Sequence, residues 1–131
     1  MSGFKTVLLV DDDDITITIC NRLMQISNFA EEVIACSDGQ QAREYLLAHV
    51  STPPDLILLD LHMGIMNGWE FLEWYQKWTA VFSNYPPVYV LSSSLSDEDS
   101  KRAKGFQQVK GFIIKPMTVD HLNEISSQVH V

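Results

Sequence analysis

Short, wholly apolar runs recur along this chain, and four of them stop at a residue able to bind a phosphate or a metal ion. They are residues 7–10 before Asp11, 56–59 before Asp60, 88–91 before Ser92 and 112–114 before Lys115. Strands that are apolar at every position are typical of a parallel sheet, because both of their faces are buried. Ligands of open parallel sheets bind beyond the carboxyl ends of the strands, so these four polar residues are predicted to converge on one spot.

Helical patterns alternate with strand patterns from one end of the chain to the other. Strands are predicted at 7–10, 33–36, 55–59, 88–91 and 109–114, and helices at 15–27, 40–49, 69–78, shortly after Ser96 and at 118–129. Alternation of this kind implies right-handed crossovers and a parallel sheet that carries helices on both faces. We therefore expect one doubly wound, three-layer α/β domain over residues 1–131, with tails only at 1–5 and at the last one or two residues.

Apolar spacing within the helices indicates how they pack. The first and last helices carry apolar residues at helical spacing, namely Ile19, Leu23 and Ile26 in the first and Val119, Leu122, Ile125 and Val129 on the inner stripe of the last. The helix at 69–78 is rich in aromatic residues, and Trp69 and Trp74 do not fit one stripe. For these two we expect half-buried packing rather than an exposed contact site.

The formal net charge of −8 narrows the classes of partner. Nucleic acids and anionic lipids both require a basic face on the protein, so neither is expected as a partner. The first apolar run gives way to four acids after residue 10, which is too short for a signal or membrane-spanning segment. We therefore expect a cytoplasmic protein in which Cys20 and Cys36, which lack metal-ligand spacing, are reduced and buried.

Four consecutive acids, Asp11 to Asp14, follow the first strand. Asp13 and Asp14 are best explained as caps of the following helix, because the helix dipole favours anions at its N-terminus. Capping does not account for Asp11 and Asp12, which lie at the strand end. Carboxylates held close together repel, and a divalent cation relieves that repulsion. Hard oxygen ligands of this kind suit Mg²⁺.

Asp60 and Lys115 are predicted to form a charged pair. A strand-terminal Asp often simply starts a turn, but a Lys behind an apolar strand needs an anionic partner, because Lys is seldom buried unpaired. A structural ion pair is therefore one interpretation. The ion pair is also compatible with a functional role for Asp60, since a carboxylate held by a lysine and a metal is poised to accept a phosphoryl group. Ser92 either belongs to a polar loop or donates a hydrogen bond to a phosphoryl oxygen.

In combination, these positions resemble the receiver domain of response regulators, the phosphorylatable half of two-component signalling, over essentially the whole chain. That family carries two acids after its first strand, an Asp after the third, a Ser or Thr after the fourth and a Lys-Pro after the fifth. The corresponding residues here are Asp11, Asp12, Asp60, Ser92 and Lys115-Pro116. The resemblance implies a flavodoxin-like (βα)5 domain with strand order 2-1-3-4-5. We expect a stand-alone receiver without an effector domain or DNA-binding part.

The resemblance also implies a role for each residue in a phosphorelay. Asp60 would take a phosphoryl group from a phosphohistidine on a histidine kinase or a phosphotransfer protein, and Ser92 and Lys115 would bind phosphoryl oxygens. Mg²⁺ would be held by Asp11, Asp12, Asp60 and the backbone carbonyl of His62. Such a module catalyses only its own phosphorylation and dephosphorylation and transforms no external substrate.

The output of such a module is a change of partner-binding surface. Phosphorylation would shift a two-state equilibrium by pulling Ser92 inward, with Phe112 in the place of the family's switch aromatic. Phe112 fits equally well as a core residue, and it lacks the hydroxyl of the more usual Tyr. The output surface in this family is often the fourth helix, fifth strand and fifth helix, here about residues 95–130. Its downstream protein is unknown, and a dimer that forms on phosphorylation is a further expectation.

The chain departs from the family pattern in the loop at 62–67. Gly64 stands where members commonly have Pro, which predicts a more flexible loop, and Asn67-Gly68 replaces the usual Asp-Gly. His62 and Ser94 occupy the two variable positions that tune acyl-phosphate lifetime in this family.

Two other functions fit parts of the pattern. An aspartyl-phosphate phosphatase of the haloacid-dehalogenase kind needs a second Asp two residues after its nucleophile, where this chain has His62. A degenerate receiver would bind partners without phosphorylation, although all five site residues are present. Turnover of a phosphomonoester would favour the first alternative, and a lack of Mg²⁺ binding would favour the second.

Overall fold

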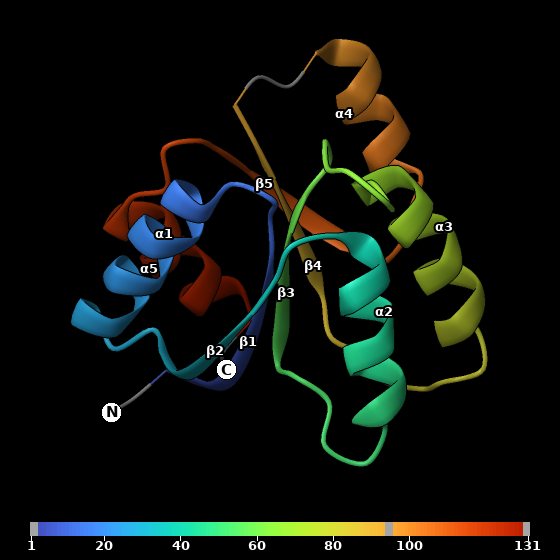
Figure 1. The fold of residues 1–131 in the computed structure, drawn as a ribbon, viewed down its shortest axis with the longest axis horizontal. Coiled ribbons are helices and arrows are strands. Elements are labelled where there is room, and N and C mark those ends of the chain that lie inside the picture. Colours follow the sequence, from blue (N-terminus) through green and yellow to red (C-terminus); the bar gives the residue numbers. More distant parts are fainter. Residues whose placement is uncertain (1–2, 94–95, 130–131) are drawn as a thin grey trace.

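Five parallel strands form the centre of the molecule in the order β2-β1-β3-β4-β5 (Figure 1). The computed structural model describes residues 3–93 and 96–129. In chain order the elements are β1 (Phe4–Val10), α1 (Asp14–Ile26), β2 (Ala30–Cys36), α2 (Gly39–Ala48), β3 (Leu56–Asp60), α3 (Gly68–Thr79), β4 (Val88–Ser92), α4 (Asp97–Lys104), β5 (Val109–Ile114) and α5 (Val119–Val129). The α/β, flavodoxin-like prediction and its strand order are confirmed. Among these described elements, no helix is both long and apolar enough to cross a membrane.

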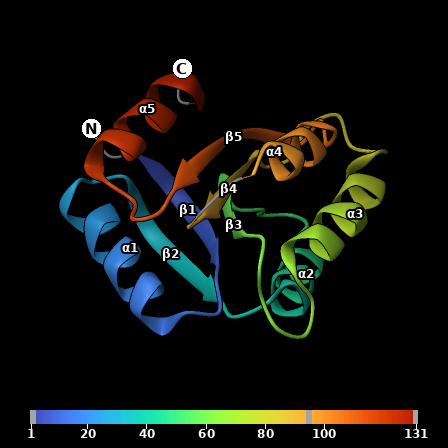
Figure 2. The ribbon, with the colours of Figure 1, turned by 90° about the horizontal axis from the view of Figure 1, so that it is seen from above.

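Two layers of helices cover the sheet, and each layer has its own core. Figure 2 shows α1 and α5 on one face and α2, α3 and α4 on the other. Successive strand residues point to opposite faces, so Leu9 and Leu58 pack toward α1 and α5, whereas Leu8 and Ile57 pack toward α2 and α3. Full burial of one such side chain stabilises the fold by roughly 1.5–3 kcal/mol. Strands β3 and β4, which are buried at every position, therefore anchor the sheet.

The buried face of α1 is not the one that its isoleucines mark. Ile19 and Ile26 are 48% and 66% exposed, while Cys20 and Met24 are buried against the sheet. Leu23 packs only partly against the same core. The apolar spacing located the helix but not its inward stripe, because Cys20 and Met24 repeat the spacing of Ile19 and Leu23 one position further along.

Both ends of the described chain belong to the fold. β1 begins at Phe4, inside the predicted tail, because the Phe4 ring is buried edge-on against Phe29 with 5.1 Å between ring centroids. In α5, Leu122 and Ile125 are buried as predicted, whereas Val119 is exposed. The predicted tail positions 1–2 and 130–131, and Ser94, lie outside the described residues.

Strand β2 is longer than predicted and forms one edge of the sheet. It begins at Ala30 rather than at Val33, and its first half carries the exposed residues Glu31 and Glu32. Those two charges interrupt the apolar pattern, which is why the sequence showed only the second half of the strand.

Side-chain caps begin the first four helices. The cap interpretation is confirmed for Asp13, whose carboxylate accepts the backbone N–H two residues on at 3.1 Å. Asp38 and Ser96 cap α2 and α4 by accepting the backbone N–H three residues on. Asn67 and Glu70 form a reciprocal capping box at α3, with hydrogen bonds of 2.9 and 3.1 Å. Such caps satisfy backbone N–H groups that otherwise lack a partner within the helix.

Four aromatic residues of α3 pack in a continuous cluster, namely Phe71, Trp74, Tyr75 and Trp78. Trp69 is buried, and Trp74 is half-buried and stacks on Trp78 with 4.9 Å between ring centroids. The expectation of half-buried packing is confirmed for Trp74. Inside the core, Phe71 stacks on Tyr75 at 5.5 Å.

Candidate functional site

The polar residues predicted at the strand ends lie along one edge of the sheet. Asp60 and Ser92 are the last residues of β3 and β4, whereas Asp11 and Lys115 directly follow β1 and β5. The parallel register aligns these ends: Asp60 of β3 pairs with Leu91, the residue just before Ser92 of β4. The backbone carbonyl of Ser92 accepts the N–H of Lys115 at 2.8 Å, which ties the last two strand ends together.

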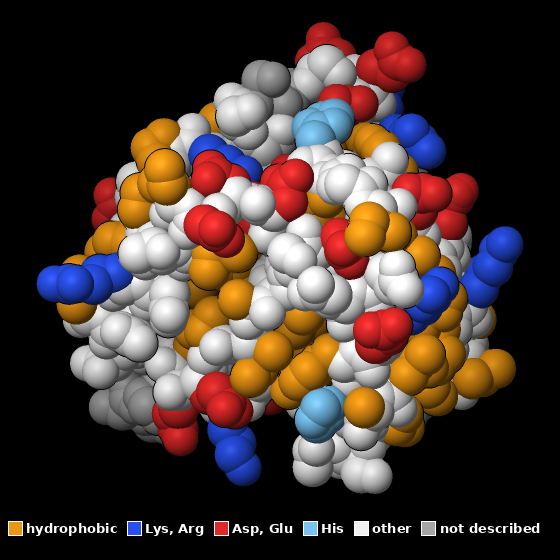
Figure 3. Space-filling view, viewed as in Figure 1, with side chains coloured by type: hydrophobic (Ala, Val, Ile, Leu, Met, Phe, Trp, Pro, Cys, Tyr) orange, Lys and Arg blue, Asp and Glu red, His pale blue; other side chains and the backbone are white. Residues whose placement is uncertain are grey.

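Three carboxylates meet at this edge. One oxygen from each of Asp11, Asp12 and Asp60 lies within 4.8 Å of the other two. Asp11 is fully buried and Asp60 is 5% exposed, whereas Asp12 faces solvent. Acidic side chains gather near the upper ends of β1 and β3 in the space-filling view (Figure 3). The cluster is therefore buried on the protein side and open on the solvent side.

Lys115 is held by two of these acids. Its Nζ lies 2.7 Å from Oδ2 of Asp11 and 3.8 Å from Oδ2 of Asp60. The predicted pair with Asp60 is therefore present, but the shorter contact is with Asp11. The apolar run before Lys115 could not reveal this preference, because it depends on how β1 and β5 approach each other across the intervening strands.

Electrostatics at the site favour a protonated lysine and oppose ionisation of Asp60. Burial raises the pKa of Asp60 and the charge of Asp11 raises it further, against the opposing effects of the His62 N–H and Lys115. Burial alone would lower the pKa of Lys115, but the hydrogen bond to Asp11 and the charge of Asp60 outweigh it, so the pKa is raised. A cation placed among these carboxylates would favour the charged form of Asp60.

Backbone groups fix the orientation of the acids. Oδ1 of Asp11 accepts the N–H of Asp13 at 2.9 Å, and Oδ1 of Asp60 accepts the N–H of His62 at 3.2 Å. Gly68, the first residue of α3, packs directly on the backbone of Asp60. A Cβ at Gly68 would lie 2.5 Å from the Asp60 carbonyl oxygen, so a larger residue would displace the strand end. In the sequence, Gly68 was noted only as part of Asn67-Gly68, which replaces the usual Asp-Gly of the family.

The other predicted residues occupy different surroundings. Ser92 is buried at the end of β4. Phe112 is half-buried and packs against the core on the α2 and α3 face. The side chain of His62 is exposed. A Cβ built on Gly64 would meet no atom within 4 Å, so no steric contact requires glycine there.

The donor set at this edge fits a hard divalent cation. Carboxylate oxygens are the ligands that Mg²⁺ prefers, and Mg²⁺ usually retains several waters while binding only one or two carboxylates. Two buried acids and one exposed acid provide the oxygens and leave a side open for water. Asp11, Asp12 and Asp60 are therefore the side chains that would hold such an ion.

Comparison with protein families gives one match that spans most of the chain. The family described as "Response regulator receiver domain" matches residues 7–126. Among curated proteins, the chain is 28% identical over 126 residues to the probable methanogenesis regulatory protein FilR2 of Methanothrix harundinacea, covering 94% of this chain and 79% of that protein. It is 34% identical over 119 residues to the putative two-component response regulator ARR21 of Arabidopsis thaliana, covering 91% of this chain but only 18% of that protein.

Solved structures agree with this match. A two-component response regulator from Cytophaga hutchinsonii superimposes with a TM-score of 0.89 at 29% identity, covering 97% of both chains. The bacteriophytochrome response regulator RtBRR gives a TM-score of 0.79 at 30% identity, covering all of this chain and 80% of that one.

Proposed function

The chain belongs to the response regulator receiver domain family, and from that premise we propose that Asp60 accepts a phosphoryl group from a histidine kinase or a histidine phosphotransfer protein. The observation that carries this proposal is the meeting of three carboxylates with one ammonium. The Lys115 Nζ lies 3.8 Å from Oδ2 of Asp60, inside the acidic cluster. An anionic acceptor beside fixed positive charge is the arrangement that phosphoryl transfer requires.

The proposed step exchanges one bond to phosphorus for another. A carboxylate oxygen of Asp60 forms a bond to phosphorus while the bond from phosphorus to the donor's imidazole nitrogen breaks, and that nitrogen retains the electron pair. Lys115 and Ser92 bind the phosphoryl oxygens as the transferred group approaches. Lys115 suits this role because burial and two carboxylate neighbours keep its ammonium fixed at the site.

Mg²⁺ is the cofactor proposed for this step, held by Asp11, Asp12, Asp60 and the backbone carbonyl of His62. When bound, Mg²⁺ neutralises charge that accumulates on the phosphoryl oxygens. The exposed side of Asp12 leaves the acidic cluster accessible to a donor protein. The buried position of Asp11 keeps one ligand oxygen and the Lys115 ammonium in a defined geometry.

The proposed output is a phosphorylation-dependent change of binding surface. Ser92 would move toward the phosphoryl group and Phe112 would follow it, altering contacts of α4, β5 and α5. Phe112 packs against the α2 and α3 face of the core and has no hydroxyl, so this rotation would be driven by packing alone. We propose a cytoplasmic receiver, with an unidentified downstream protein and a dimer that forms on phosphorylation.

Phosphorylation with a small donor tests the assignment directly. Incubation with acetyl phosphate and Mg²⁺ should add one phosphate to the intact protein, as read by mass spectrometry, and Asp60→Asn should remain unmodified. Asp120→Asn, which changes an exposed acid in the first turn of α5, is the matched control and should be labelled normally. Equal labelling of Asp60→Asn would assign the acceptor elsewhere, and unlabelled wild type would favour a degenerate receiver.

A further inference from the structure

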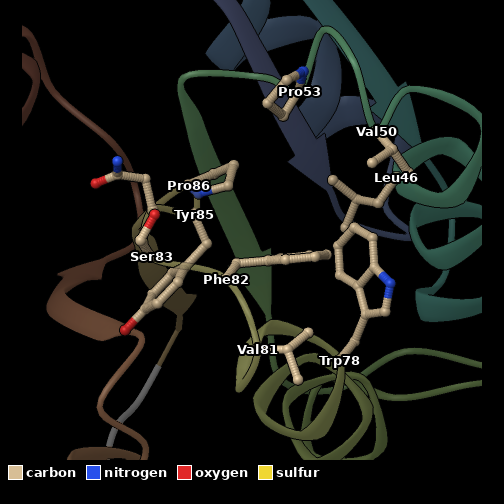
Figure 4. A pocket seen from close by; sticks show the side chains of 10 residues that line it. Leu46, Val50, Pro53, Trp78, Val81, Phe82, Ser83, Tyr85 and Pro86 are labelled. Atoms are coloured by element: carbon tan, nitrogen blue, oxygen red, sulfur yellow. The ribbon is translucent and has the colours of Figure 1, made fainter.

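A hollow of about 370 Å³ lies between α2 and α3, at the end of the sheet opposite the acidic cluster (Figure 4). Its lining includes Pro53 and Pro86, which shortly precede the amino ends of β3 and β4. Leu46 comes from the last turns of α2, Trp78 from the end of α3 and Phe82 from the segment after it. In Figure 4 these three side chains point toward one another around the hollow.

The walls of this hollow, which we call the α2–α3 pocket, are held in place by their own contacts. Trp78 stacks on Trp74 with 4.9 Å between centroids and 15° between planes, and Phe82 meets Trp78 edge-on at 5.0 Å. Beneath them, the buried Tyr75 hydroxyl donates to the carbonyl of Pro86 at 2.7 Å. Side chains that are already fixed lose little conformational entropy when a ligand binds.

Apolar side chains remain exposed around the α2–α3 pocket. Val50 and Val81, both part of its lining, are 54% and 84% exposed, and Trp78 and Phe82 are only half-buried. Single exposed apolar residues are normal on protein surfaces. Four that surround one hollow are a different case, because concave apolar surface of this size is the usual form of a small-molecule site.

The lining specifies the chemistry of a ligand. None of the described residues that line the pocket is Lys, Arg, His, Asp or Glu, and its side-chain polar groups belong to Trp78, Ser83, Asn84 and Tyr85. A phosphate or carboxylate would lose its hydration there without gaining a cationic partner. A flat ring, in contrast, can lie against Trp78 and Phe82 in offset or edge-on geometry.

We propose that the α2–α3 pocket binds an uncharged planar aromatic molecule of one or two rings, with a hydrogen-bonding edge toward Ser83 and Asn84. The volume falls within the range of about 300–1,000 Å³ that is typical of small-molecule sites. The pocket lies at the amino ends of the strands, whereas the acidic cluster lies at their carboxyl ends. Its occupant therefore does not compete with a phosphoryl donor.

Indole tests the proposal, and indole-3-carboxylate serves as the charged probe with the same ring. The tryptophan Nε1–H signals in a ¹H–¹⁵N spectrum separate the pocket from the rest of the fold, because Trp78 lines the pocket and Trp69 does not. Indole should shift the Trp78 signal saturably, with a dissociation constant on the order of 1 mM for so small a ligand, and leave Trp69 unchanged. The carboxylate should bind at least about tenfold more weakly, since no cation faces it.

A charge introduced at the rim should change this preference. Val81→Lys lies at a highly exposed position and should bring the affinity for indole-3-carboxylate up to or above that for indole. Val119→Lys makes the same change on α5, outside the pocket, and should leave both affinities as in the wild type. Absence of saturable shifts with indole, equal binding of both probes to the wild type, or equal effects of the two lysine variants would overturn the proposal.

Discussion

The two ends of β3 and β4 carry opposite chemistry. Their carboxyl ends reach three carboxylates and one ammonium, whereas their amino ends reach an uncharged hollow walled by Trp78 and Phe82. The same uniformly buried strands support both. Strand cores therefore supply the common rigid frame, and the residues immediately outside each strand decide what kind of ligand that end can hold.

Charge neutralisation at the carboxyl end should produce the largest effect on stability. Lys115→Met removes the cation 2.7 Å from fully buried Asp11 and leaves that carboxylate uncompensated. We expect a loss of about 3 kcal/mol in the free energy of unfolding, measured by urea denaturation. Adding Asp11→Asn should restore most of it. Lys110→Met, at an exposed position of β5, is the control, and an equal loss there would show that the charge pair is not the cause.

Cys20 and Cys36 are buried thiols that lie in the cores on opposite faces of the sheet, so their reactivity allows the two faces to be compared. Burial, and then the charge of Asp11, raises the pKa of Cys20 to about 11, and burial with the charge of Asp38 does the same for Cys36. At pH 8 both should react with a disulfide reagent about 100-fold more slowly than in denaturant, since far less thiolate is present.

The same thiols predict how stability depends on pH. An unfolded thiol, with the ordinary pKa of 9.0, releases its proton before a native one does. Their contribution to stability is therefore complete below about pH 8.5 and declines as pH rises toward 11. Urea midpoints at pH 8 and pH 10 measure it. Native thiols that react as fast as denatured ones would contradict both expectations.

A smaller effect is expected under the apolar end. Tyr75→Phe deletes the buried hydroxyl that donates to the Pro86 carbonyl and leaves that acceptor without this hydrogen bond. The free energy of unfolding should fall by about 1 kcal/mol, with half-buried Tyr45→Phe as the comparison. If the pocket walls depend on this bond, indole binding should weaken as well, which a urea titration alone would not reveal.

The smallest effect concerns the contact between α3 and α4. Cζ of Arg102 lies 4.2 Å from the centroid of the Trp69 ring. Because Arg102 is exposed, Arg102→Ala should cost about 0.5 kcal/mol. Lys104→Ala, also exposed in the last turn of α4, provides the baseline. A shift of the Trp69 Nε1–H signal only in the Arg102 variant would identify the cation–π contact as the source.

The sequence predicted the charged end of the sheet much better than the apolar end. Asp11, Asp60 and Lys115 stood out because each follows an uninterrupted apolar run, and parallel strands must align such ends. The partner preference of Lys115 could not be read, since it depends on distances across several strands. The capping box of Asn67 and Glu70 was readable as a cap residue followed three positions later by Glu, but the glycines drew that segment into a loop.

The apolar end was not predicted because its determinants are tertiary. The α2–α3 pocket depends on the separation of α2 and α3, and helical periodicity gives no information about that distance. For the same reason the buried stripe of α1 was misplaced: Ile19 and Cys20 lie at neighbouring positions with similar spacing, and only docking on the sheet selects between them. Tertiary packing decides such cases over local pattern.

The exposed glutamates of β2 bear on how the protein behaves at high concentration. An edge strand presents backbone groups that can pair with the same strand of another copy, which is a common route to aggregation. Glu31 and Glu32 are successive residues of β2, so they place one negative charge on each face of that edge, and a second copy would bring like charges against them. The same charges that interrupted the apolar strand pattern therefore oppose edge-to-edge pairing between copies. Neutralising both residues should lower solubility.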